Sequence, residues 1–162
     1  MSQMSSFSPG AMMGAPMQMP ETESFPMPSA VRLKRMGERP MEFTGEELCF
    51  AMSYVPSAPF WFEINVWRRS EGDFVTAVKL FYRDSDRIDV CRAWTSDDFE
   101  AVMDALESYD AARDLDADVN LNADMPLVDL TAAAMTLRAW AADARRQYGS
   151  LVGQILDELE NG

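Results

Sequence analysis

The chain has 162 residues, a length that suggests a single domain. Its 48% hydrophobic and 25% charged content is that of a globular protein and excludes disorder of the whole chain. A formal net charge of −13 repels nucleic-acid phosphates and anionic lipid. The composition therefore predicts a protein partner, with basic surfaces attracted most readily, and no direct binding of nucleic acid.

Residues 1–40 differ from the rest, because they hold eight of the 13 methionines and six of the nine prolines. Repeated proline prevents helices and sheet ladders. We expect a disordered or extended tail over residues 1–40, ending in Arg32, Lys34 and Arg35, and one acidic domain over residues 41–162. The methionines suit contact with a partner, although an inert tail explains them equally well. Because prolines interrupt the start of the chain and no long apolar run follows, we expect no secretory signal, no membrane span and a cytoplasmic protein.

Alternating apolar side chains predict antiparallel strands from residue 46 onward. Residues 46–54 fit a strand, although a short helix is the competing interpretation. The next two strands direct one set of side chains to a core: Phe60, Phe62, Ile64 and Val66, then Phe74, Val78, Leu80 and Tyr82. A third strand directs Ile88 and Val90 inward. Short turns join these segments, so the sequence predicts an antiparallel β-meander of three to four strands.

Two helices are predicted after the meander. Thr95 and Ser96 offer a hydroxyl N-cap for an amphipathic helix that packs on the strands through Phe99, Val102, Met103 and Leu106. A long C-terminal helix starts near Asp129 and carries an alanine-rich stripe, with a break expected near Gly149. The predicted fold class is therefore α+β.

The stretch DLDADVNLNADM alternates polar and apolar residues from Asp114 to Met125. Its opening D-x-D-x-D resembles a calcium-binding loop, where oxygen ligands surround the ion. Val119 replaces the glycine of such a loop, however, and Met125 replaces its bidentate glutamate. An extra edge strand with a charged solvent side, or a solvated loop, is the better interpretation, so we predict no metal site.

No arrangement of reactive residues points to catalysis. The chain contains no histidine, and Cys49 and Cys91 have no metal-binding spacing. We expect buried, reduced thiols, with a cross-strand disulfide as the alternative in an oxidising compartment. No glycine-rich phosphate motif is present, and no nucleophile has an identifiable base. The sequence therefore predicts no catalytic residues, no cofactor and a protein that is not an enzyme.

The second face of the meander carries aromatic and basic side chains, of the types most enriched at binding hot spots. Either the C-terminal helix or another protein is expected to cover these rings. The predicted partner-binding residues are Trp61, Trp67, Phe81, Arg68, Arg69 and Trp94.

The order of meander, helix, polar alternating strand and long terminal helix resembles that of the small dimeric chaperones of bacterial secretion systems and their non-secretory relatives. The resemblance covers about residues 45–160 and is carried by element order and charge. The weak strand before the last helix and the Met/Pro-rich tail depart from the family pattern.

These observations predict a non-catalytic partner-binding protein, such as an adaptor, a chaperone-like protein or an assembly-accessory subunit. It would use the aromatic sheet face or the C-terminal helix to bind a partner or to form a homodimer. One alternative is an acidic decoy, because residues 97–126 carry one basic and ten acidic residues and would mimic nucleic acid toward a basic DNA-binding protein. The other alternative is a small enzyme that uses carboxylate chemistry.

Overall fold

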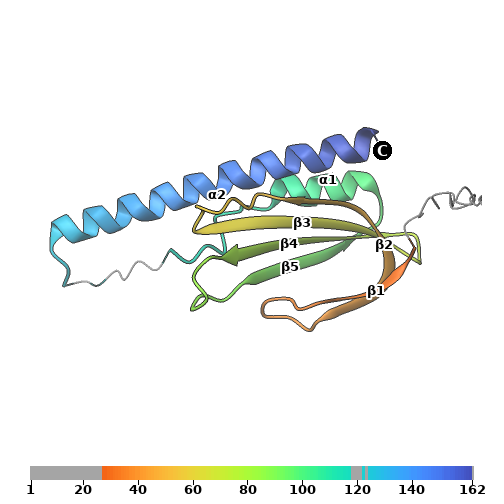
Figure 1. The fold of residues 1–162 in the computed structure, drawn as a ribbon, viewed down its shortest axis with the longest axis horizontal. Helices are drawn as coiled ribbons and strands as arrows, with labels where there is room; N and C mark the ends of the chain where they lie inside the picture. The colour runs from red at the N-terminus through yellow and green to blue at the C-terminus, as the bar shows by residue number, and fades with distance from the viewer. Residues whose placement is uncertain (1–26, 118–121, 123, 162) are drawn as a thin grey trace, which may run out of the picture.

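The computed structural model describes residues 27–117, 122 and 124–161. Within them, five antiparallel strands pair in chain order to form one curled sheet (Figure 1). The strands are β1 (Ser29–Leu33), β2 (Met41–Met52), β3 (Phe60–Arg69), β4 (Phe74–Tyr82) and β5 (Val90–Ser96). The helices are α1 (Phe99–Ser108) and α2 (Leu127–Asn161). The predicted α+β class, with a meander, a short helix and a long terminal helix, is confirmed.

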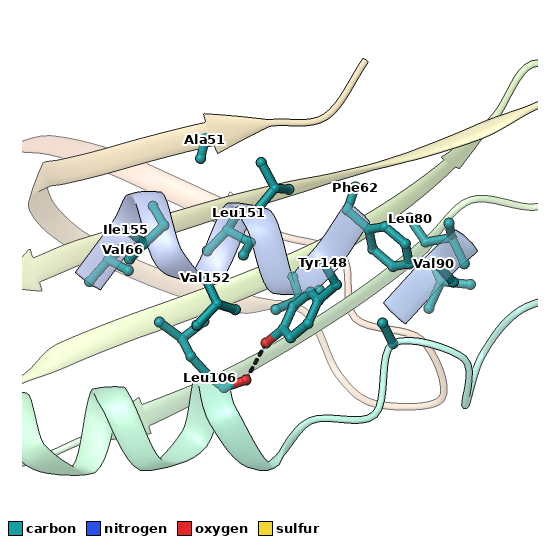
Figure 2. Packing of buried hydrophobic residues seen from close by; sticks show 14 of the residues in the cluster. Ala51, Phe62, Val66, Leu80, Val90, Leu106, Tyr148, Leu151, Val152 and Ile155 are labelled. Carbon is teal, nitrogen blue, oxygen red and sulfur yellow. Dashed lines mark hydrogen bonds between the residues drawn. The ribbon is translucent and has the colours of Figure 1, made fainter. Parts of the chain in front are cut away.

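Both helices lie on one face of the sheet, here called the inner face (Figure 1). The predicted inward residues of β3 are confirmed, since Phe60, Phe62, Ile64 and Val66 are all fully buried. From the helices, Leu106, Leu151 and Ile155 pack against this face (Figure 2). The Tyr148 hydroxyl donates a hydrogen bond of 2.6 Å to the Leu106 carbonyl oxygen, which joins the two helices inside the core.

A bend in β2 gives the sheet its curl. The first half of β2 pairs with β1 and the second half with β3, and a β-bulge interrupts the pairing between Glu47 and Cys49. Gly45 lies where the two pairings meet, and a Cβ atom there would stand 2.5 Å from the Arg68 carbonyl oxygen. Only glycine allows this close approach of the two backbones. Bulges bend the strand that carries them, so the bulge and Gly45 together turn the β1–β2 hairpin over the sheet.

The β1–β2 hairpin covers half of the second face, here called the outer face. The Met36 amide donates a hydrogen bond of 3.0 Å to the Cys91 carbonyl oxygen of β5, so the hairpin turn reaches the far edge of the sheet. Beneath the hairpin, Phe43 meets Trp67 edge to face with ring centroids 5.5 Å apart. The buried cluster is Leu33, Phe43, Trp67, Val75, Ala77 and Ala93. The β1–β2 hairpin, and not α2, therefore covers the ring of Trp67.

Three sequence predictions about the strands and the tail need correction or completion. The tail does not extend to residue 40, because Ser29–Leu33 forms β1 and Leu33 is buried; residues 1–26 lie outside the described residues. The strand interpretation of residues 46–54 is correct up to Met52, where β2 ends. Ile88 is 77% exposed, because β5 begins only at Val90. The Asp89 carboxylate accepts a hydrogen bond from the Tyr82 amide and keeps this segment in a loop.

The helix predictions also change in detail. The N-cap of α1 is Asp98, whose carboxylate accepts a hydrogen bond from the Ala101 amide, and not Thr95 or Ser96. Helix α2 passes through Gly149 without a break, since its packed face on both sides of this residue holds the helix in place. No strand forms over residues 114–117, and the rest of the predicted edge strand lies mostly outside the described residues.

Helix α2 is longer than the sheet that it covers. Its N-terminal part extends past the end of the sheet (Figure 1), and the first of its residues to pack on the core is Trp140. Among the described residues, no helix combines the length and the apolar character that crossing a membrane requires.

Candidate functional site

The half of the outer face that the hairpin leaves open carries a cluster of large apolar side chains. They come from the end of β2 and the residues after it, the start of β3 and the end of β4. On the β2 side, Phe50, Met52 and Tyr54 are 43%, 45% and 48% exposed. We call this cluster the aromatic patch: Phe50, Met52, Tyr54, Trp61 and Phe81.

The bulge in β2 decides which of its side chains reach the aromatic patch. After the bulge, Cys49 pairs with Val66 and Ala51 with Ile64, so these two small side chains face the helices. Phe50 and Met52 consequently turn to the outer face. Small side chains under a helix allow it to approach the sheet closely, so the larger residues of β2 lie on the open side.

Three rings of the aromatic patch, Tyr54, Trp61 and Phe81, hold one another in place. Tyr54 and Trp61 meet edge to face with centroids 4.8 Å apart, and Trp61 stacks on Phe81 across the strand pair at 5.9 Å. Both arrangements are preferred geometries of aromatic pairs. Next to them, Lys79 pairs with Glu63 at 3.5 Å. The patch is thus an ordered apolar surface with a charged pair at its border, and an ordered surface loses little side-chain entropy on binding.

Of the predicted partner-binding aromatics, the structure brings Trp61 and Phe81 together. Trp67 is only 6% exposed and lies under the hairpin. Trp94 lies on the inner face, where it packs against Tyr109 with ring centroids 6.0 Å apart. Two of the four predicted aromatic residues therefore contribute to the open surface.

The two predicted arginines lie at the end of β3 that is remote from Trp61. Arg68 is exposed, and Arg69 forms paired hydrogen bonds with Asp73 at 2.7 and 2.5 Å. The hydrogen bond from Arg69 holds the pKa of the Asp73 carboxyl below its usual range. This ion pair closes the β3–β4 turn, so Arg69 has a structural role at a distance from the aromatic patch.

Sequence reasoning missed Phe50, Met52 and Tyr54 as candidate site residues. Their period-2 spacing shows that they share a face of the strand. Which face they share depends on the register with β3 and on the bulge, and the sequence marks neither. Size alone would have placed Phe50 in the core and Ala51 outside, the reverse of what the structure shows.

In the acidic stretch that resembled a calcium loop, carboxylates pair with arginine side chains of the same chain. Asp114 accepts hydrogen bonds from Arg92 at 2.9 and 2.6 Å and from the Tyr109 hydroxyl at 3.0 Å. The bond from Arg92 is the main reason why the pKa of Asp114 lies below its usual range. In the described part of the chain, no three His, Cys, Asp or Glu residues are grouped as metal ligands would be. Asp118 and Asn120 lie outside the described residues.

Two further carboxylates within residues 97–126 are also paired with arginines. Asp110 pairs with Arg145 on α2, and Asp116 pairs with Arg87. These contacts neutralise part of the charge that a mimic of nucleic acid would present. The ion pairs therefore weaken the acidic-decoy alternative.

Replacing Asp114 by asparagine is expected to lower the free energy of unfolding by about 1–3 kcal/mol at neutral pH, because charged hydrogen bonds to Arg92 are lost. The pKa of Asp114 is lower in the folded chain than in the unfolded chain. Its carboxylate therefore contributes fully to the free energy of unfolding above the unfolded pKa of about 3.9, and this contribution is lost as the pH falls through the folded pKa. Urea denaturation at pH 7 and near pH 3 checks both points. The matched control is Asp110→Asn, whose ion pair is exposed and should matter less.

The two cysteines are free and lie on opposite faces of the sheet. Cys49 is buried on the inner face and Cys91 belongs to the outer cluster, so the disulfide alternative does not apply. Burial, with smaller contributions from Glu158 and Glu47, raises the pKa of the Cys49 thiol to about 12. Burial also raises the pKa of Cys91. Both groups are therefore protonated at neutral pH and are poor nucleophiles.

A depression of about 380 Å³ lies between α1 and α2, with Tyr109 and Tyr148 in its lining. Both tyrosine hydroxyls donate to internal acceptors, Asp114 and the Leu106 carbonyl, and burial raises the pKa of each. Neither phenol is thereby prepared for acid–base chemistry, and the aromatic patch remains the stronger candidate site. Comparisons of the chain with protein-family models, curated proteins and solved structures give no match.

Proposed function

We propose that this chain is a non-catalytic partner-binding protein, an adaptor, chaperone-like or assembly-accessory subunit, and that the aromatic patch binds an apolar segment of a protein partner. The observation that carries the proposal is the exposure of Phe50, Met52 and Tyr54 beside the ordered Trp61–Phe81 pair. Contiguous exposed apolar surface on a folded protein usually marks an interaction site.

The surroundings of the aromatic patch favour a protein ligand. Val55, which follows Tyr54 in the chain, is a further exposed apolar residue at 50%. The Glu63–Lys79 pair at the border offers one negatively charged acceptor and one positively charged donor, like the polar rim of a protein interface. The net charge of −13 would steer a basic partner toward the chain from a distance.

A photo-crosslinking residue in place of Tyr54 tests the proposal. The matched control carries the same residue in place of Phe99 on α1, which is 42% exposed but lies outside the patch. Proteins captured at position 54 and not at position 99 are identified by mass spectrometry, purified and titrated against the chain by calorimetry.

The double variant Phe50→Ser and Tyr54→Ser is expected to weaken binding of the purified partner roughly 30-fold or more, as the loss of interface hot spots does. The two side chains are 43% and 48% exposed and lie outside the buried core, so the variant should fold. Phe99→Ser should leave the affinity unchanged. Equal affinity of the double variant and the unmodified chain would show that the patch is not the binding surface.

A further inference from the structure

The part of α2 that extends past the sheet is unusually apolar for an exposed helix. Residues 127–142 contain only two charged side chains, Asp129 and Arg138. Leu127 and Val128 are each 77% exposed and Met135 is 66% exposed. A helix with so few charges is normally buried, so this segment, here called the arm, is expected to have a covering partner.

One side of the arm carries a regular line of exposed apolar side chains, here called the outer stripe: Val128, Ala132, Met135, Ala139 and Ala142. Steps of four and three residues alternate along it, which is the spacing of a coiled-coil seam. At about 100° per residue, the outer stripe points away from the side on which Ala144, Leu151 and Ile155 enter the core. Figure 1 shows no other described element on that side of α2.

We propose that the outer stripe is covered by the outer stripe of a second copy, in an antiparallel helix pair centred on Met135. The two helices then contact through matched layers. Val128 of one copy faces Ala142 of the other, Ala132 faces Ala139, and the two Met135 side chains meet at the centre. Alanines in the layers let the helices approach closely, and the flexible methionines fill the remaining central space.

The charges at the ends of the outer stripe favour this antiparallel pairing. Arg146 follows Ala142 by one more step along the same line, and it pairs with Asp143 within its own helix. At the other end of the arm, Asp124 and Asp129 are exposed. In this register an antiparallel pair brings Arg146 of one copy to the level of Asp124 of the other, whereas a parallel pair would place the two Arg146 side chains together.

The charge of the whole chain also favours a second copy at this position. The arm has one charge of each sign, while the chain carries −13. Two identical acidic chains therefore meet with least repulsion through their arms. In the antiparallel pair the folded bodies lie at opposite ends and on opposite sides of the helix pair, so they do not clash. A basic partner, in contrast, would find few carboxylates on the arm.

Solution mass over a concentration series of the full chain tests the pair. The chain of 18.2 kDa is expected to reach twice that mass. The variant Val128→Glu/Met135→Glu is expected to stay at the mass of one chain, because it places four carboxylates in the seam of the pair. The control Thr131→Glu/Thr136→Glu adds the same charge beside the outer stripe and should still dimerise, with helix content compared by circular dichroism. One-chain mass at every concentration, or a dimer that the Val128/Met135 variant leaves intact, would refute the pairing.

Cysteine cross-linking tests the antiparallel register independently. Under mild oxidation, Met135→Cys is expected to give a covalent dimer that the unmodified chain, with its own Cys49 and Cys91, does not give. Val128→Cys should not cross-link to itself, because the two positions would lie about 21 Å apart along the helix axis. Mixed chains carrying Val128→Cys and Ala142→Cys should cross-link. Efficient cross-linking at position 128 alone, without any at position 135, would refute this register. Because the aromatic patch lies on another surface, failure of this pairing leaves the proposed function untouched.

Discussion

Replacing Phe43 by alanine is expected to lower the free energy of unfolding by about 3–5 kcal/mol, the range for deletion of a buried phenylalanine ring. Phe43 is 9% exposed and meets Trp67 edge to face under the β1–β2 hairpin. Its removal leaves a cavity between the hairpin and the sheet and deprives Trp67 of its cover. Urea denaturation of the variant and the unmodified chain measures the loss.

Phe50 provides the matched control for Phe43, because both phenylalanines belong to β2. Phe50 is 43% exposed in the aromatic patch, so Phe50→Ala should cost clearly less stability. A small loss for Phe43→Ala, similar to that of Phe50→Ala, would show that the hairpin does not close the outer face in solution. A partner would then remain the better explanation for the cover of Trp67.

Replacing Leu151 by alanine is expected to cost about 2–5 kcal/mol of unfolding free energy, since large-to-small changes leave a cavity in a packed core. Leu151 is 1% exposed, between α2 and the inner face of the sheet. The effect is large because all the buried residues of α2, from Ala144 to Ile155, lie in its C-terminal half. Thermal or urea unfolding of the purified variant gives the measurement.

Leu127 is the control on the same helix, since it is 77% exposed on the arm. Measured at a concentration low enough to avoid association, Leu127→Ala should leave the stability nearly unchanged. Equal losses at the two leucines would contradict the division of α2 into a packed half and an unsupported arm.

The central hairpin and α1 could be predicted from sequence because local periodicity decides them. Phe62 and Leu80 alternate with polar or surface residues along β3 and β4, and both are buried as expected. Val102 and Leu106 share one side of α1 through their helical spacing. In these elements the sequence pattern and the final packing agree.

β1 and the curl of the sheet could not be predicted in this way. The five residues of β1 lie between Pro28 and Pro40 and are too few to show a clear period, so the local sequence favours a tail. Long-range pairing with Met41–Gly45 overrides that preference. The bend depends on a bulge and on the contact between Gly45 and the Arg68 backbone, neither of which has a local signature.

The candidate site shows the same division between local and long-range information. The alternation of β3 and β4 predicted that Trp61 and Phe81 lie on the second face, and the structure places them side by side. The burial of Trp67 depends on Phe43, which lies 24 positions earlier in the chain. The exposure of Phe50 depends on the bulge. Periodicity thus identified the face but not the part of it that stays open.

The hydrogen bond between Met36 and Cys91 links the first turn of the described chain to its last strand. The guanidinium of Arg92 adds a second contact, to the Met36 carbonyl oxygen, at 3.5 Å. A strand edge with free backbone groups invites pairing with other molecules. Because the turn of the first hairpin occupies part of the free edge of β5, it limits pairing of this strand with strands of other molecules. A substitution that releases the turn is therefore expected to promote aggregation.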